Sequence, residues 1–108
     1  MSIRLEKTWL PLTAENLKPV KGQVGVYQLG SEGDGVTFIG FAGGKSLFGL
    51  KGELEPLLSK GPNTCFRLEV TTAYHTRYRE LLMIHIADHG EPPRDNGELP
   101  RLGRLSPA

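Results

Sequence analysis

The stretch VGVYQLGSEGDGVTFIGF, residues 24–41, decides the fold of this 108-residue chain. Two runs rich in apolar, β-branched and aromatic residues, 24–29 and 36–41, flank a segment of turn-forming residues from Gly30 to Gly35. Such runs on either side of a short turn-rich segment are typical of a β-hairpin. We therefore expect two antiparallel strands joined by a six-residue loop.

Downstream of the hairpin, the sequence alternates between helical and strand patterns. Leucines recur at helical spacing across residues 46–59, and residues 65–71 alternate between apolar and polar. The first pattern predicts a helix, and the second predicts a third strand with one solvated face. A longer helix is expected from Ala73 to His89, ended by Gly90. The order ββαβα predicts an α+β domain, with a small three-stranded antiparallel sheet and flanking helices.

The two ends of the chain carry weaker patterns. Residues 1–22 are expected to form an irregular arm that packs on the core through Trp9, with Thr13 capping a short helical turn. Residues 23–97 then form the domain itself. The last segment, residues 98–108, lacks periodicity and contains glycine and proline, so we expect a flexible tail.

The composition excludes several classes of protein. Thirteen Lys and Arg residues against twelve Asp and Glu give a net charge of +1, so no global basic field attracts nucleic acid, although local basic patches remain possible. A single cysteine, Cys65, excludes an intrachain disulfide and a cysteine-based zinc site. No signal-peptide pattern and no membrane-spanning apolar run is present. These features predict a cytoplasmic protein without a membrane partner.

The loop from Gly40 to Ser46 follows a strand and precedes a helical pattern, as a phosphate-binding loop does. Only three residues separate Gly40 from Gly44, whereas the P-loop pattern requires four. A weaker prediction survives, in which free backbone N–H groups from Gly44 to Leu47 and the Lys45 side chain bind an anion at a helix N-terminus. The favoured alternative is a plain turn followed by a Ser46 cap.

The predicted 73–89 helix carries the other candidate groups. His85 and His89 are four residues apart and share a face, which is half of a metal site or, as we favour, a surface pair. Glu80 lies three residues after Arg77, and the pair is expected to form an ordinary surface interaction.

The ordered set of these features resembles the GIY-YIG nuclease fold over residues 22–97. Gly25-Val26-Tyr27 corresponds to the first tripeptide of that family, and Phe38-Ile39-Gly40 to the second. Glu80 matches the glutamate on the late helix, and Asn96 matches a late asparagine. The resemblance implies phosphodiester hydrolysis, in which the glutamate holds Mg²⁺ or Mn²⁺, a tyrosine assists deprotonation of water and an arginine stabilises the phosphate.

Two departures bear on that activity. Phe38 lacks the hydroxyl of the second tyrosine, and the arginine is missing from its place near Gly49 or Leu50, where Lys51 is one of the nearest cations. Losing a charge-stabilising donor costs about 10²–10³ in rate, and losing an acid–base group costs about 10²–10⁴. We therefore expect a GIY-YIG-like domain that has lost efficient nuclease activity. Its degenerate catalytic positions are Tyr27, Phe38, Lys51 and Glu80.

Such a domain retains a weak surface for the backbone of DNA or RNA and needs no cofactor. The residues expected on this surface are Gly44, Lys45, Ser46, Arg77, Arg79 and Asn96. Two alternatives stay open. One is an active divergent nuclease, in which Tyr27 acts as the base and Glu80 binds Mg²⁺ or Mn²⁺. The other is a protein-interaction or small-ligand-binding domain, whose contact surface comprises the glycine-rich loops, Trp9 and the tail.

Overall fold

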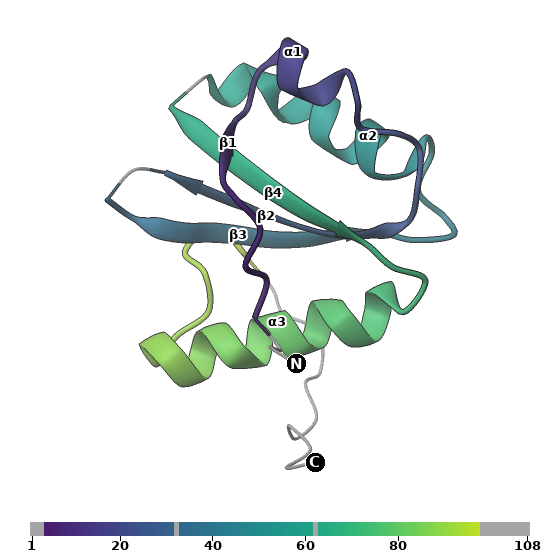
Figure 1. Ribbon diagram of the computed structural model, residues 1–108. Helices are drawn as coiled ribbons and strands as arrows, with labels where there is room; N and C mark the ends of the chain where they lie inside the picture. The colour runs from purple at the N-terminus through teal and green to yellow at the C-terminus, as the bar shows by residue number, and fades with distance from the viewer. Residues whose placement is uncertain (1–3, 32, 62, 98–108) are drawn as a thin grey trace.

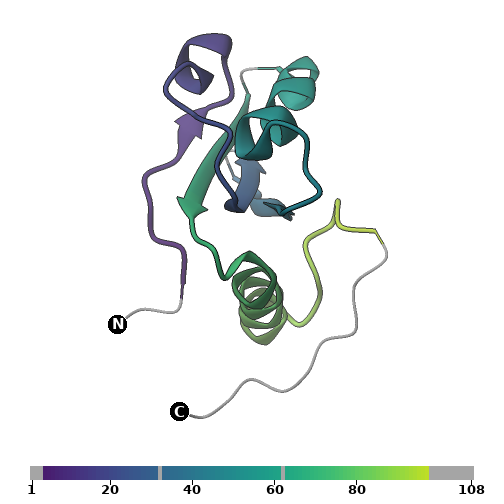
Figure 2. The same ribbon diagram turned by 90° about the vertical axis from the view of Figure 1, so that its right-hand side faces the viewer.

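The computed structural model describes residues 4–31, 33–61 and 63–97 (Figure 1). A four-stranded antiparallel sheet carries two short helices and a 3₁₀ helix on one face and a long helix on the other (Figures 1 and 2). The elements are β1 (Leu10–Pro11), α1 (Ala14–Leu17), β2 (Gly25–Ser31), β3 (Gly35–Ala42), α2 (Gly49–Leu54), the 3₁₀ helix η1 (Glu55–Lys60), β4 (Thr64–Val70) and α3 (Tyr74–His89). The α+β class is confirmed, but the sheet has four strands where the sequence predicted three.

The additional strand, β1, lies in the segment predicted to be an irregular arm. The strand order is β1-β4-β2-β3, and β1 contributes only Leu10, opposite Phe66, and Pro11, opposite Cys65. Two residues are too few to show the period-two pattern on which strand prediction rests. The arm packs on the core, where Leu12 is buried.

The hairpin forms as predicted, with a tighter turn. Ser31 pairs with Gly35, so both strands extend into the expected six-residue loop and leave only residues 32–34 between them. The Asp34 amide donates to the Ser31 carbonyl (3.0 Å), and the Ser31 hydroxyl donates to the Asp34 carboxylate (2.7 Å). These two bonds close the turn and set the register of the long strands.

Two apolar clusters lie on opposite faces of the sheet, because successive residues of a strand point to opposite sides. The cluster beneath α1, α2 and η1 includes Leu12, Leu17, Tyr27, Leu29, Leu50, Leu54 and Phe66. The cluster against α3 includes Leu5, Val26, Ile39, Leu81 and Leu82. Neighbouring residues of β2 therefore serve different faces.

The helix predicted over residues 46–59 is shorter and begins later. Phe48 and Gly49 both have left-handed backbone angles (φ 64° and 59°), so a right-handed helix cannot run through them from Ser46. The prediction that Ser46 caps the helix is wrong, since α2 begins at Gly49. The helix narrows to 3₁₀ geometry from Glu55, where Pro56 has no N–H for an α-helical bond.

The other helix predictions are confirmed. α3 ends at His89, and Gly90 adopts the left-handed conformation (φ 81°) while its N–H donates to the Ile86 carbonyl (2.7 Å). The Thr13 hydroxyl caps α1 by accepting from the Asn16 amide (3.2 Å). Among the described residues, no helix has the length and apolarity to cross a membrane. The predicted tail, residues 98–108, lies outside the described residues.

Candidate functional site

The sheet separates the residues that the GIY-YIG resemblance would bring together. Tyr27 is 5% exposed, lies in the cluster under α2 and packs beside the Phe38 ring at 6.0 Å between centroids. Glu80 lies on α3, which packs against the opposite face of the sheet (Figure 1). Lys51 lies on α2. The structure thus brings Tyr27 and Phe38 together and places Glu80 away from them.

Arg77 links α3 to β4. Its Nε and Nη2 donate to the two carboxylate oxygens of Glu69 (3.1 and 3.2 Å), and its Nη1 donates to Glu80 (2.5 Å). The Arg77 side chain is only 12% exposed. The expected Arg77–Glu80 pair is confirmed, but it is not an ordinary surface pair. It is part of a three-residue ionic cluster, so Arg77 does not present itself to a phosphate backbone.

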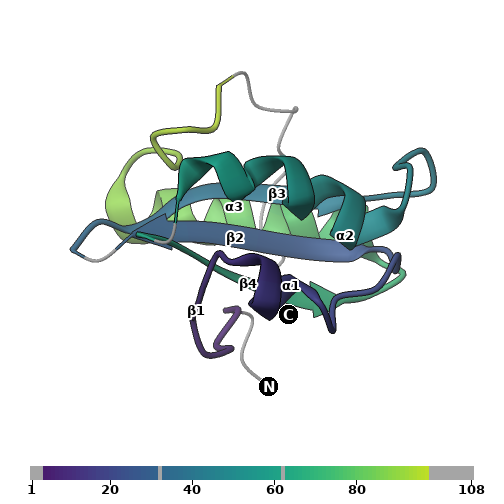
Figure 3. The same cartoon turned by 90° about the horizontal axis from the view of Figure 1, so that it is seen from above.

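Asn96 extends the hydrogen-bond ladder of the sheet. Its Oδ1 accepts from the Ile39 amide and its Nδ2 donates to the Ile39 carbonyl, both at 2.9 Å. The Asp95 amide also donates to the Thr37 carbonyl (2.9 Å). The segment after α3 therefore covers the outer edge of β3 (Figure 3), which protects it from pairing with other chains. The Asn96 amide is occupied by this structural role, contrary to the predicted role in nucleic-acid binding.

The loop before α2 is a closed turn. The Gly43 amide donates to the Ser46 hydroxyl (3.0 Å), the Gly44 amide to the Tyr74 hydroxyl (3.1 Å) and the Ser46 amide to the Gly43 carbonyl (3.0 Å). The prediction of free amides that bind an anion is wrong at Gly44 and Ser46, because protein groups already accept from them. The plain turn is the correct interpretation of this segment, although Ser46 caps no helix.

A surface pocket of about 800 Å³ lies where this turn meets α2 and the start of α3. We call it the β3-end pocket. Its lining residues are Phe41, Gly43, Gly44, Lys45, Ser46, Leu47, Glu53, Tyr74 and His75. Three of the predicted nucleic-acid-binding residues, Gly44, Lys45 and Ser46, thus come together here.

Aromatic rings form one wall of the β3-end pocket. Phe41 lies 5.8 Å from Tyr74 with the rings nearly parallel (8°), and it lies 4.9 Å from both His75 and Tyr78. His75 is exposed, and Phe41 and Tyr74 are half-buried. Arg79, one turn after His75 on α3, is exposed but does not line the pocket, so the structure does not bring it together with Gly44, Lys45 and Ser46. In the sequence, Phe41 lies in a predicted strand, and Tyr74 and Tyr78 lie in a predicted helix. Nothing in the sequence indicated that these side chains are in contact.

Glu53 is the acidic residue of this pocket, and the sequence analysis missed it. The Ser46 hydroxyl donates to its carboxylate (3.1 Å). Burial first, and then the charge of Glu53, raise the pKa of Tyr27 well above its ordinary value. Tyr27 therefore keeps its proton at neutral pH and cannot serve as a base there. The only sequence signal for Glu53 is its place seven residues after Ser46 in the helix predicted there, and that signal is not specific.

The described residues do not fit the metal site that the resemblance implies. They contain no group of three or more His, Cys, Asp or Glu side chains arranged to hold a metal ion. Glu80 is engaged by Arg77, as described above. His85 and His89 lie 4.4 Å apart between ring centroids, and the His85 Nδ1 is within 3.0 Å of the Glu91 carbonyl. This arrangement agrees with the prediction that His85 and His89 form a surface pair.

Residues 3–88 match the model of a family described as a domain of unknown function, DUF7508. The chain belongs to the DUF7508 family. No curated protein and no solved structure matches it. The matched residues of the DUF7508 domain include the whole lining of the β3-end pocket and exclude Asn96.

The raised pKa of Tyr27 predicts how the stability of the DUF7508 domain depends on alkaline pH. The unfolded tyrosine ionises near pH 10, whereas the folded tyrosine holds its proton above that pH. Unfolding is therefore favoured as pH rises past 10, and Tyr27 contributes a loss of about 1.4 kcal/mol per pH unit. Urea unfolding of the wild type and Tyr27→Phe at pH 8–11 measures this contribution as a difference. Parallel losses of stability in the two proteins would contradict the assignment.

Proposed function

We propose that this chain is a non-catalytic GIY-YIG-like module that binds single-stranded nucleic acid weakly in the β3-end pocket. The β2–β3 hairpin, α2, β4 and α3 follow one another in the order on which the resemblance rests. The tripeptides of the resemblance lie on the two strands of that hairpin. This agreement supports the scaffold, and the chemistry of the individual residues supports the loss of catalysis.

Three features argue against hydrolysis. The Tyr27 phenol is buried and holds its proton, so it does not activate water. Phe38 has no hydroxyl with which to replace it. Glu80 is paired with Arg77 on the far face of the sheet, where it does not face Tyr27.

The observation that carries the binding proposal is the aromatic wall beside Lys45 in an open pocket. Bases stack on such rings with about 1–3 kcal/mol per base, without regard to sequence. Lys45 supplies positive charge for one phosphate. The Glu53 carboxylate opposes it, and with the net charge of +1 it keeps the affinity low.

Fluorescence anisotropy with labelled single-stranded DNA and RNA 12-mers at low salt tests the proposal. One phosphate contact predicts a slope of about −0.7 in a plot of log K against log salt concentration. His75→Ala should weaken binding about 5–150-fold through lost stacking. Lys45→Ala should reduce the slope by about 0.7. Lys60→Ala is the matched control, because Lys60 is exposed and lies at the end of η1, outside the pocket. Equal binding by all four proteins would overturn the proposal.

Glu53→Gln separates a binding module from an enzyme. Removing the charge that repels phosphate should strengthen binding about 3-fold, as expected for a loss of 0.5–1 kcal/mol of repulsion near the surface. The same oligonucleotides incubated with Mn²⁺ should remain intact. Cleavage that Glu53→Gln or Glu80→Gln abolishes would show instead that the domain is a divergent nuclease.

A further inference from the structure

The outer edge of β4 is only half covered. β1 pairs with it at Phe66 and Cys65, and the Leu12 amide donates to the Thr64 carbonyl (2.8 Å). In an antiparallel ladder, alternate residues turn both backbone polar groups to the same side. Thr64 and Phe66 turn theirs toward β1, so Leu68 and Val70 do the same. Within the described residues, no strand pairs with Leu68 or Val70 on that side.

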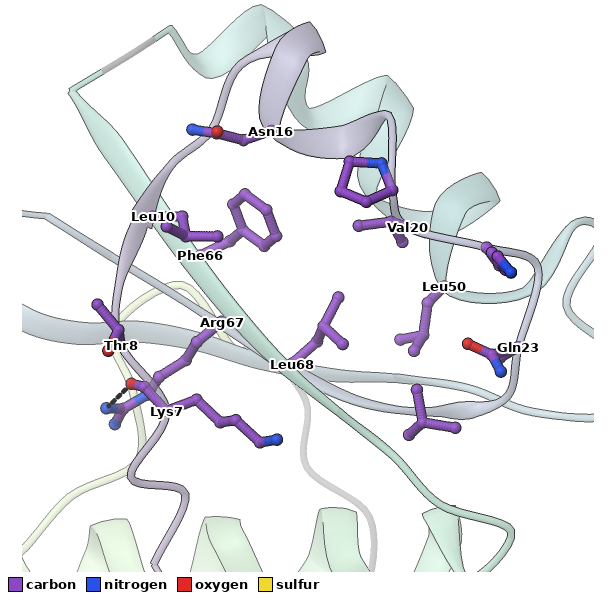
Figure 4. A pocket seen from close by; sticks show the side chains of 13 residues that line it. Lys7, Thr8, Leu10, Asn16, Val20, Gln23, Leu50, Phe66, Arg67 and Leu68 are labelled. Carbon is purple, nitrogen blue, oxygen red and sulfur yellow. Dashed lines mark hydrogen bonds between the residues drawn. The ribbon is translucent and has the colours of Figure 1, made fainter.

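The residues of the arm that precede β1 do not pair with this open edge. The Arg67 guanidinium lies 4.2 Å from the Trp9 ring centre, and its Nη1 donates to the Lys7 carbonyl (3.3 Å). Its Nε donates to the Gln28 side chain (2.7 Å), which fixes its position. The arm is therefore held at Lys7 and Trp9, and the edge beyond Phe66 stays open (Figure 4).

An apolar groove of about 340 Å³ borders the open edge (Figure 4). Its apolar lining comes from four parts of the chain and comprises Leu10, Pro19, Val20, Leu50, Phe66, Leu68 and Val70. Leu10 and Val70 are 43% and 50% exposed, unlike ordinary core residues. We call this the β4-edge groove.

The charged residues of the β4-edge groove all carry positive charge. They are Lys7, Lys21 and Arg67, and among the residues that the structure describes no Asp or Glu lines the groove. Lys7 comes from the arm and Lys21 from the segment before β2. The groove therefore favours an acidic occupant. The C-terminal segment is a poor match, because it carries Arg101 and Arg104 against the single acidic residue Glu98. A second copy would bring the same positive charges to the groove.

We propose that the open edge of β4 binds an extended acidic peptide of a partner protein as an additional strand. The peptide backbone pairs with Leu68 and Val70, and every second side chain enters the β4-edge groove. Aspartate or glutamate residues at the two ends of the peptide lie near Lys7 and Lys21 at the rim of the groove. Backbone pairing requires a peptide, which sets this site apart from a pocket for a small apolar ligand.

A labelled heptapeptide, Glu-Val-Glu-Leu-Glu-Val-Glu with capped ends, is the probe. ¹⁵N-resolved NMR titration should shift the amides of Leu68 and Val70. N-methylation of alternate peptide residues in one register should abolish binding, while methylation in the other register leaves it intact, because only one set of amides faces β4. Absence of shifts at Leu68 and Val70, or equal effects of the two methylated peptides, would overturn the proposal.

Charge reversal tests the acidic preference without disturbing the core. Lys7→Glu with Lys21→Glu should weaken heptapeptide binding about 10-fold, since both residues are exposed rim charges. Lys60→Glu is the matched control and should bind as the wild type does. Equal binding by the doubly substituted protein would overturn the preference.

Two further measurements separate the alternatives. Sedimentation velocity should show a monomer across the concentrations used, and self-association that the heptapeptide dissociates would show that a second copy is the occupant. The groove borders the edge of β4, whereas the β3-end pocket lies past the end of β3, and the two share no lining residue. A single-stranded 12-mer should therefore leave heptapeptide affinity unchanged, and the peptide result stands whether or not nucleic acid binds.

Discussion

Replacing Gly25 by alanine should lower the free energy of unfolding by about 3 kcal/mol or more, the upper end for overpacking. A Cβ atom at Gly25 would lie 2.2 Å from the Glu69 carbonyl oxygen and 3.0 Å from the Val70 Cα. Both are backbone atoms of β4, the strand that pairs with β2. They can move away only if the ladder between the two strands opens.

Urea unfolding followed by circular dichroism measures this effect. Gly97→Ala is the matched control, since a Cβ there meets nothing within 4 Å, and its stability should stay within about 0.5 kcal/mol of the wild type. A Gly25→Ala protein as stable as the control would refute the steric argument.

A close contact also accounts for Gly40, the glycine of the second tripeptide of the resemblance. A Cβ at Gly40 would lie 2.5 Å from the Tyr27 ring and hydroxyl, because the Tyr27 ring lies across Gly40 on the neighbouring strand. Packing therefore favours glycine at both positions, since a Cβ at Gly25 would meet backbone atoms and one at Gly40 would displace the buried Tyr27 side chain. Neither glycine is evidence for nuclease chemistry in this chain.

Substituting Arg77 with methionine should destabilise the domain by about 2–4 kcal/mol. Methionine keeps much of the apolar stem but leaves Glu69 and Glu80 without the guanidinium that pairs with both. Removing one partner from a buried ionic cluster costs about 3–5 kcal/mol, and we lower that range because the two carboxylates are 29% and 32% exposed.

Arg4→Met provides the comparison for the Arg77 substitution. Arg4 also holds a carboxylate with two nitrogens, Nε at 3.2 Å and Nη2 at 2.7 Å from Asp88, but its side chain is 55% exposed. Its loss should therefore cost clearly less stability than the loss of Arg77, because solvent screens an exposed ion pair. Adding Glu69→Gln and Glu80→Gln to Arg77→Met should restore part of the lost stability. Equal losses in the free energy of unfolding for the two arginine substitutions would show that Arg77 does not stabilise the domain by pairing with Glu69 and Glu80.

The elements that could be predicted from the sequence are those with a local signal. Runs of apolar, β-branched and aromatic residues on both sides of a glycine-rich turn specify the hairpin, since strand preference and turn chemistry act within a few residues. The helix over 74–89 is equally local, because its spacing and Gly90 mark its body and its end. The predicted helix start at Ser46 failed where the left-handed conformations of Phe48 and Gly49, set by packing against the segment before β2, outweighed the capping signal.

The partners of the site residues depended on the tertiary structure. The resemblance implies that Tyr27 and Glu80 share one site, but they lie on opposite faces of the sheet. Phe41 and His75, in contrast, are in contact although 34 positions separate them in the sequence. Local periodicity determines which face of its own element a side chain occupies. The order of strands in the sheet decides which element packs on that face. It therefore decides whether Arg77 meets a phosphate or Glu69. Contacts between residues distant in sequence fix that order.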